Sequence, residues 1–328
     1  MELLLTLPTQ QLTQYLKTNN WINPVEEVQS LEIPGLGNMN RVLRVKTHQG
    51  SLILKQAIPF VNKYPDIPAP VDRIAVEHQF YQAIESNEEL LSFLPRIIGF
   101  DSKQYILAME DLGNAIDFTR LYQLGQHLTV KETTDIASGL RLLHQFNFSI
   151  EQQRRFPKNF ELRQLNHQHI FKFPLMEENG FDLDSVTPGL QPLARQYKTD
   201  KALKRRAKEL GQIYLEQGTT LLHGDYYPGS WLLSNAGFKI IDPEFCFFGH
   251  QSFDLGVLLA HIKMAQQTEK TRKLLLDAYE LNVDMELLNA FEGIEIIRRI
   301  IGLAQLPLEL PLTTKEELLA YAYQKVMS

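Results

Sequence analysis

The sequence predicts an α+β fold, in which a small antiparallel sheet precedes a larger, mainly helical part. The first observation is a series of three short runs rich in branched apolar residues, at 28–33, 42–46 and 52–57. Only turn residues separate these runs, and because no helix fits into the gaps, the strands are expected to be antiparallel neighbours. The second observation is that the chain after Gly113 has mainly helical spacing of its apolar residues.

The small part contains two more strands and one main helix. The strands are predicted at 96–100 and 104–110, and the helix at 71–86. A shorter helical segment starts at Thr9, before the first strand. We therefore expect five strands and one main helix in an N-terminal domain, followed by a helical C-terminal domain, with the bounds 1–113 and 114–328.

The helical part begins with a capping box, because Glu132 follows Thr129 by three residues and predicts a helix over 129–146. We expect His144, beside the apolar face of this helix, to be structural. Residues 147–190 are expected to be irregular, because Pro and Gly interrupt them repeatedly. Asp254 suits the N-terminus of a following helix. Three more helices are predicted, at 252–264, 268–279 and 285–306.

Composition excludes several classes of partner. The 328 residues carry a net charge of −6, and the densest basic segment, 198–208, is expected to be a solvated helix face. A nucleic-acid partner is therefore not expected. The single cysteine, Cys246, suits a reducing compartment and a buried position. No basic leader and no span-length apolar run is seen, so a cytoplasmic protein without a membrane partner is expected.

A glycine-containing turn at 34–38 precedes a candidate ion pair. The turn lies between two strands, where backbone amides can approach phosphates, although a plain hairpin turn explains its glycines equally well. Lys55 ends an apolar strand, and Glu77 falls in the apolar stripe of the helix at 71–86. An acid on an inward helix face needs a cationic partner. We expect Lys55 to be that partner.

The stretch 221–254 is the most informative part of the chain. It places Asp225 and Asp242 on either side of two apolar strands, 231–233 and 238–241, with a tight turn at 234–237. A hairpin returns its ends to one place, so we expect the two carboxylates to face one another. Facing carboxylates repel each other unless a cation lies between them, and Mg²⁺ fits a site of few carboxylates completed by phosphate and water.

The helix predicted at 285–306 carries adjacent arginines. Arg298 falls on its apolar stripe, so the guanidinium must meet an acid, a carbonyl or a ligand phosphate. Arg299 lies four residues after Glu295, and this spacing predicts an ordinary surface ion pair worth about 0.3–0.5 kcal/mol.

These motifs carry a resemblance to a known family. The order HGD, strand pair, IDPE resembles the aminoglycoside and choline phosphotransferase branch of the protein-kinase-like superfamily. Within it, HGDxxxGS, DPEFxFxG and FDLG are similar to the methylthioribose kinase family. The resemblance implies a bilobal protein-kinase-like fold and assigns a catalytic role to Asp225. It implies that Asp242 and Glu244 hold Mg²⁺, with Glu244 also at the substrate, and that the counterpart of Asp254 orients the catalytic loop.

Other segments extend the resemblance. GLGNMNRV and LILKQA are similar to the family's nucleotide-binding segments, and MEDLG is similar to its adenine-binding segment. EIIRRIIGLA is similar to its twin-arginine segment, which implies roles for Arg298 and Arg299 in catalysis and substrate recognition. The residues implied at the nucleotide are Gly37, Asn38, Asn40, Lys55, Glu77, Glu110 and Leu112.

The resemblance implies transfer of phosphate from ATP, with Mg²⁺, to the 1-hydroxyl of 5-methylthioribose in methionine salvage. A kinase of the same fold for another hydroxyl acceptor, of aminoglycoside, choline or homoserine type, stays open, because the residues 226–228 differ from the family's usual Leu-His-Thr. A nucleotide-binding pseudokinase also stays open, since Ser230 stands where protein kinases usually have a metal-binding Asn. A homodimer is left open.

Overall fold

The computed structural model describes residues 7–35, 37 and 39–328. The chain divides into two compact units, and the first combines the chain up to Ala115 with the segment Ser234–Phe245. The second unit consists of Ile116–Leu233 and Cys246–Ser328. No helix among the described residues combines the length and the apolar character that a membrane crossing requires. The predicted lobes at 1–113 and 114–328 stay a prediction.

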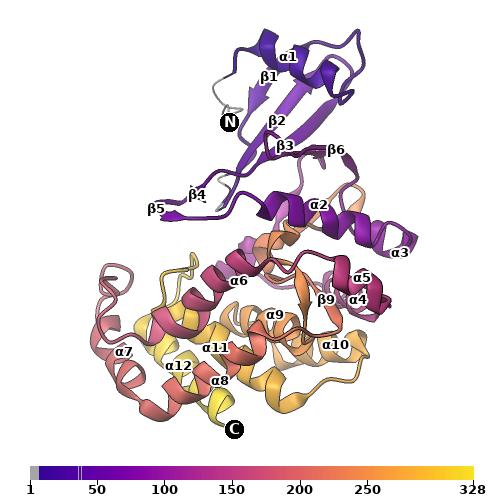
Figure 1. Ribbon diagram of the computed structural model, residues 1–328. Helices are drawn as coiled ribbons and strands as arrows, with labels where there is room; N and C mark the ends of the chain where they lie inside the picture. The colour runs from indigo at the N-terminus through magenta and orange to yellow at the C-terminus, as the bar shows by residue number, and fades with distance from the viewer. Residues whose placement is uncertain (1–6, 36, 38) are drawn as a thin grey trace. The chain divides into compact units, whose positions relative to one another are not determined.

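The first unit contains the predicted five-stranded antiparallel sheet, with the strand order β1-β2-β3-β7-β6 (Figure 1). Helix α1 (Thr9–Thr18) packs beside β1, and its Leu12 and Leu16 are buried with Val45 and Leu54 of the sheet. Strand β2 alternates buried and more exposed side chains because one face covers this core, whereas β7 is buried on both faces. Their bounds are β1 (Val28–Glu32), β2 (Arg41–Thr47), β3 (Ser51–Gln56), β6 (Ile97–Asp101) and β7 (Ile106–Glu110).

The main helix of this unit is α2 (Arg73–Ala83), shorter than the predicted 71–86. Its stripe Ile74, Glu77 and Tyr81 is buried as predicted. The short helix α3 (Glu88–Leu91) and the hairpin of β4 (Phe60–Val61) and β5 (Tyr64–Pro68) were not predicted. Helix α2 contacts the 3-10 turn Pro243–Phe245, which follows strand β11 (Gly237–Ile240). This contact brings Glu244 to the helix that carries Glu77.

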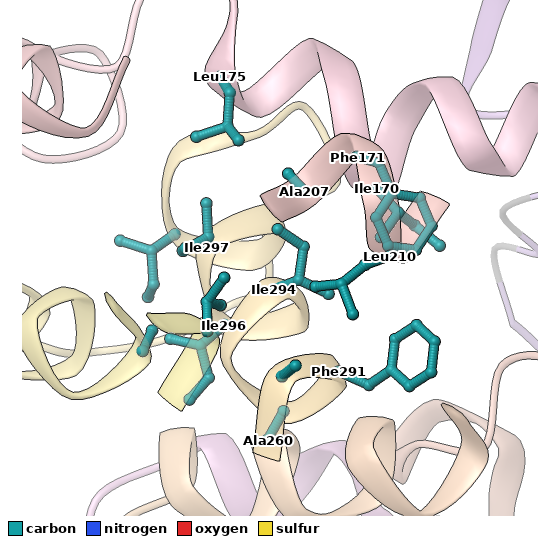
Figure 2. Close-up of a cluster of buried hydrophobic side chains, with 14 of the residues drawn as sticks. Ile170, Phe171, Leu175, Ala207, Leu210, Ala260, Phe291, Ile294, Ile296 and Ile297 are labelled. Carbon is teal, nitrogen blue, oxygen red and sulfur yellow. The ribbon is translucent and has the colours of Figure 1, made fainter. Parts of the chain in front are cut away.

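The second unit is mainly helical. Helix α11 (Met285–Ile301) makes its largest contacts with α9 (Ser252–Met264) and α12 (Leu312–Met327). Figure 2 shows α11 side chains meeting Phe171 and Leu210 of neighbouring segments in the core. Almost the whole of α11 is buried, which is why its apolar positions do not form a single stripe. The other long helices are α4 (Val130–Gln145), α7 (Leu190–Thr199), α8 (Lys201–Leu215) and α10 (Glu269–Tyr279).

Several predictions of the helical part need correction. Residues 147–190 are not irregular throughout, since they contain α5 (Ile150–Arg155), α6 (Phe160–His167) and a π-helical turn, Gln168–Lys172. Helix α11 ends at Ile301 rather than near residue 306, because Gly302 adopts an extended conformation. The predicted capping box of Thr129 and Glu132 is confirmed.

The basic segment 198–208 is not a uniformly solvated face, because Lys198 is buried.

Short strands complete the unit. Strand β9 (Thr220–Leu222) pairs antiparallel with β12 (Phe247–Gly249), and β10 (Trp231–Ser234) pairs with β8 (Ile116–Asp117). The predicted strands at 231–233 and 238–241 are thus present as β10 and β11, with Gly237 at a left-handed φ of 103° in the turn.

Candidate active site

In the first unit, Lys55 joins two carboxylates. Its Nζ donates to Oε2 of Glu77 at 2.6 Å and to Oδ1 of Asp242 at 2.7 Å. Lys55 lies on β3, which is flanked by β2 and β7, and Glu77 lies on α2. The predicted ion pair between Lys55 and Glu77 is therefore present. It is fully buried on both sides, whereas the side chain of Asp242 is 45% exposed.

The charges of this cluster support one another. Burial alone would lower the pKa of Lys55, but the carboxylates of Asp242 and Glu77 outweigh it and hold that pKa above its ordinary value. Burial also raises the pKa of Glu77, and the Lys55 ammonium opposes this rise. Lys55 is therefore a fixed cation at neutral pH. An ammonium held in this way can bind phosphate oxygens.

The predicted role of Asp242 as a metal ligand stays a prediction, which its backbone conformation and exposure support. Asp242 adopts a left-handed backbone with φ of 62°, a conformation that Asp tolerates and that recurs at functional sites. No group of three or more His, Cys, Asp or Glu side chains suited to a metal ion occurs among the described residues. The carboxylates of Asp242 and Glu244 fit Mg²⁺, which binds proteins through one or two carboxylates and takes its other ligands from phosphate and water. Asp242, with its exposed carboxylate, would hold it.

Glu244 is a buried carboxylate with two polar neighbours. Its Oε2 accepts from Asn40 Nδ2 at 2.7 Å and lies 3.3 Å from Arg73 Nε, which also donates to Asn40 Oδ1 at 2.9 Å. Burial raises its pKa, although Lys55 and Arg73 oppose this effect. Glu244 thus ties the chain after the glycine turn to helix α2. Its roles at the metal and the substrate stay predictions, and Arg73 was not predicted.

The glycine turn is partly described. A Cβ on Gly37 would lie 2.4 Å from the backbone oxygen of Asn40, so the close approach of the chain requires glycine there. Asn62 donates to the backbone oxygen of Gly37 at 2.8 Å. Asn38, also predicted at the nucleotide, lies outside the described residues. The phosphate-binding role of this turn stays a prediction.

The predicted adenine-binding segment follows β7. Glu110 ends that strand and exchanges hydrogen bonds with the backbone of Arg96, and Leu112 lies two residues beyond. Asp111, between them, accepts from Arg44 Nη2 at 2.9 Å and from Ser51 Oγ at 2.6 Å. These bonds fix the segment to β2 and β3. The roles of Glu110 and Leu112 stay predictions, and the anchor Asp111 was not predicted.

In the second unit, the loop after β9 carries Asp225. Buried Asp254 of α9 accepts the backbone N–H of His223 at 2.7 Å and of Gly224 at 3.0 Å, so the predicted contact with the loop is present. Ser230 Oγ donates to the backbone oxygen of Asp225 at 2.9 Å. His144 hydrogen-bonds Asp254 and Tyr279, in agreement with the predicted structural role. The bonds to Asp254 hold the beginning of the loop, and the bond from Ser230 holds its end.

The two arginines of α11 meet Asp225. Arg299 Nη2 donates to Oδ1 of Asp225 at 3.2 Å, and Arg298 Nη1 lies 4.0 Å from the same oxygen. Both arginines bind Glu295, Arg299 through Nε at 2.6 Å and Arg298 through Nη1 at 3.0 Å. The predicted surface pair of Arg299 with Glu295 is wrong in its setting, since the structure buries both residues. Arg298 meets acids, which are one of the three kinds of partner that its position in an apolar stripe predicted.

Burial and charge act in opposite directions on these carboxyls. Burial raises the pKa of Asp225, and Arg299 and Arg298 restrain the rise. Burial also opposes ionisation of Glu295, but the guanidinium groups of Arg298 and Arg299 hold its pKa well below the usual range. Glu295 is therefore a permanent anion. Asp225 has a pKa shifted toward neutrality, which suits a group that accepts a proton from a hydroxyl.

Sequence reasoning missed several residues around this group. They contact the arginines, Glu295 or one another from segments far away in the chain: Tyr122, Asn166, Tyr227 and His261. Asn166 comes from the segment predicted to be irregular, and its Oδ1 accepts from Arg298 at 3.3 Å. A histidine inside the apolar run of α9 was the available signal for His261. The predicted convergence of Asp225 with Asp242 joins different units and stays a prediction.

Comparisons with known proteins agree with these features. The model of the phosphotransferase enzyme family matches residues 30–291. A methylthioribose kinase of Bacillus velezensis is 28% identical over 82% of this chain and 77% of its own length. A methylthioribose kinase of Exiguobacterium sibiricum is 28% identical over 75% of this chain and 64% of its own length. The chain thus spans only 64% to 77% of these relatives.

Solved structures share the fold. A spectinomycin phosphotransferase solved with ADP and spectinomycin is similar with a TM-score of 0.61, at 15% identity and over 98% of both chains. The choline kinase LicA from Streptococcus pneumoniae is similar with a TM-score of 0.53, at 15% identity, over 97% of this chain and 98% of that one. The predicted protein-kinase-like α+β fold class is confirmed.

Proposed function

This chain belongs to the phosphotransferase enzyme family, and from that premise we propose that it transfers the terminal phosphate of ATP to the 1-hydroxyl of 5-methylthioribose. The relatives named methylthioribose kinase support the acceptor. The observation that carries the proposed chemistry is the contact of partly buried Asp225 with Arg299 at 3.2 Å. It supplies a proton acceptor next to a fixed cation, as in-line transfer to a hydroxyl requires.

Each group has a distinct part in the proposed reaction. Asp225 orients the acceptor hydroxyl and takes its proton, while Lys55 binds the phosphates of the nucleotide. Arg298 and Arg299 offset the negative charge on the group in transfer. Mg²⁺ held by Asp242, with Glu244 in support, supplies further neutralisation of the phosphate oxygens. The joint action of these groups on one nucleotide is part of the proposal.

The acceptor is the finer part of the proposal. A kinase for choline or another cationic acceptor needs acids that no cation neutralises. Around Asp225 the acid Glu295 is already bound by both arginines, and the arginines bring two positive charges. This balance favours a neutral sugar over a cation. The contact of Asp225 with Arg299 counts against the pseudokinase alternative, because a module without transfer chemistry needs no proton acceptor beside a fixed cation.

The deciding experiment is a Mg²⁺-ATP consumption assay with methylthioribose, choline, homoserine and an aminoglycoside as separate acceptors. We expect acceptor-dependent ATP consumption with methylthioribose and at least about tenfold lower kcat/KM with the others. Faster turnover of another acceptor would replace the proposed substrate. An absence of turnover with every acceptor, together with ATP binding by calorimetry, would support the pseudokinase alternative.

The setting of the reaction is also proposed. One buried cysteine favours the reducing cytoplasm, and the net charge of −6 disfavours nucleic acid as a partner. The proposal includes no membrane partner and leaves a homodimer open. Light scattering of the purified chain, at a monomer mass of 37.8 kDa, decides the oligomeric state.

A further inference from the structure

His261 links a phenol to the anion that holds both arginines. Its Nδ1 lies 2.6 Å from the hydroxyl oxygen of Tyr122, and its Nε2 lies 3.1 Å from Oε1 of Glu295. Tyr122 comes from the 3-10 turn Phe118–Tyr122, His261 from α9 and Glu295 from α11. All three side chains are buried. Three separate elements therefore meet at one imidazole.

The chemistry of the partners determines the tautomer of His261. Glu295 is ionised and can only accept hydrogen bonds, so Nε2 of His261 must carry a proton and donate. Burial, with help from the nearby Arg299 and Arg298, lowers the pKa of His261 to about 4, so the imidazole is neutral at physiological pH. Nδ1 is then an acceptor, and Tyr122 donates to it. Tyr122 therefore donates to His261, and His261 donates to Glu295.

The same chain of bonds continues to Asp225. Glu295 Oε1, which accepts from His261, also accepts from Arg299 Nε at 2.6 Å. Arg299 Nη2 then donates to Asp225. The ring of Tyr227 packs against both Arg299 and His261, with its centroid 4.9 Å from the Arg299 guanidinium and 5.1 Å from the His261 ring. Arg299 is thus held by Glu295 and covered by an aromatic face.

We propose that Tyr122 and His261 are positioning residues, which fix Glu295 and through it the guanidinium of Arg299 on Asp225. The inference rests on the proposed function only in taking Asp225 as the proton acceptor. Glu295 without a second anchor could rotate with the arginines, because an ion pair between long side chains tolerates several geometries. A neutral histidine removes this freedom without adding a third positive charge beside the two arginines.

The chain of hydrogen bonds from Tyr122 to Asp225 is called the relay here. Its effect can be measured as the pKa of Asp225. Arg299 and Arg298 lower the pKa of Asp225, while burial and the charge of Glu295 raise it, and His223 has a smaller lowering effect. The groups around His261 are Tyr122, Glu295 and the two arginines, and the ring of Tyr227 is tilted by 46° against its ring. If Arg299 were held less firmly, its guanidinium would oppose the effect of burial on the pKa of Asp225 less strongly. The pKa of Asp225 would therefore rise when the relay is broken.

The test compares two Tyr→Phe variants by NMR of side-chain carboxyl carbons, without substrate. Tyr122→Phe removes the phenol of the relay. Tyr321→Phe is the matched control, because Tyr321 donates at 2.7 Å to Glu292, a buried acid one turn before Glu295 on α11. We expect Tyr122→Phe to raise the pKa of Asp225 by about 0.5 unit or more and Tyr321→Phe to leave it unchanged. Equal shifts, or no shift in Tyr122→Phe, would overturn the proposal.

A second readout uses the wild-type protein and depends on no variant. Nitrogen NMR of labelled histidine is expected to show His261 neutral from pH 8 to pH 5, with the proton on Nε2. A proton on Nδ1, or a charged ring at pH 7, would contradict the relay. Turnover is a separate measurement: kcat should fall about three- to tenfold in Tyr122→Phe with KM for ATP unchanged. A wild type without turnover would refute the proposed function, while the NMR readouts would still decide the relay.

Discussion

Arg299 Nη2 lies 3.2 Å from Oδ1 of Asp225, so a guanidinium carried by helix α11 holds the carboxylate of the loop after β9. The same guanidinium donates to Glu295 one turn earlier on its own helix. A cation placed in this way lowers the cost of burying Asp225 and is close to the site of phosphoryl transfer in the proposed reaction. The two contacts connect the stability of the loop to its chemistry.

The first prediction concerns the neighbouring arginine. Arg298→Ala should lower kcat/KM for methylthioribose by about a hundredfold, because a cation next to Asp225 and the buried partner of Glu295 are lost together. Lys204→Ala is the control, since Lys204 pairs with Glu177 at the surface. Steady-state kinetics of both variants measure the difference. Equal losses would mean that the substrate pocket has been misplaced.

The second prediction concerns the buried pair in the first unit. Glu77→Gln keeps the shape of the side chain but removes the charge that directs Lys55, so kcat/KM for ATP should fall by about ten- to a hundredfold. Glu32→Gln, at the exposed partner of Lys46, should have no effect. An unchanged kcat/KM for ATP in Glu77→Gln would show that the pair does not position the nucleotide.

The third prediction separates Asp242 from Glu244. Asp242→Asn should raise the Mg²⁺ concentration for half-maximal turnover more than Glu244→Gln does. The reason is that the side chain of Asp242 is 45% exposed, whereas Glu244 is buried against Asn40 and Arg73. Titration of each variant with MgCl₂ at saturating ATP gives this concentration. The reverse order would make Glu244 the principal metal ligand.

The fourth prediction is a dependence of stability on pH. His261 is neutral in the folded state down to its pKa of about 4, whereas an unfolded histidine takes up a proton near the ordinary histidine pKa of 6.5. Between these values the unfolded state binds more protons, so the free energy of unfolding should fall as the pH falls from 6.5 to 4. The loss approaches about 3 kcal/mol from this group.

Urea unfolding at several pH values tests this linkage. His261→Gln should remove this part of the pH dependence, and His48→Gln, at an exposed position, should retain it. Identical pH dependence in His261→Gln and in the wild type would contradict the burial of a neutral imidazole.

Sequence reasoning succeeded where a charge had to be explained locally. Glu77 in an apolar stripe demanded a cation, and Lys55 was available on a neighbouring strand, as the structure shows. The antiparallel sheet followed from short runs with no room for helices. Arg298 in an apolar stripe likewise demanded an acid, a carbonyl or a ligand phosphate, and the structure places the acid Glu295 beside it.

The missed features depend on contacts between distant segments. The spacing of Glu295 and Arg299 is the same for a surface pair and a buried one, and only the packing of α11 against α9 and α12 decides between them. Tyr122 and His261 are 139 residues apart, so no local pattern relates them. Helices α5 and α6 have only 6 and 8 residues and are separated by Pro157, so neither is long enough to show a clear periodicity.

The most direct test of the central claim is phosphorus NMR of the product formed from ATP and methylthioribose by wild type, Asp225→Ala and the control Asp277→Asn. Asp277 is an exposed partner of Lys273. The account predicts a sugar 1-phosphate signal with wild type and control, and none with Asp225→Ala, which should still bind ATP measurably in calorimetry. Near-normal product formation by Asp225→Ala would contradict the catalytic assignment of Asp225.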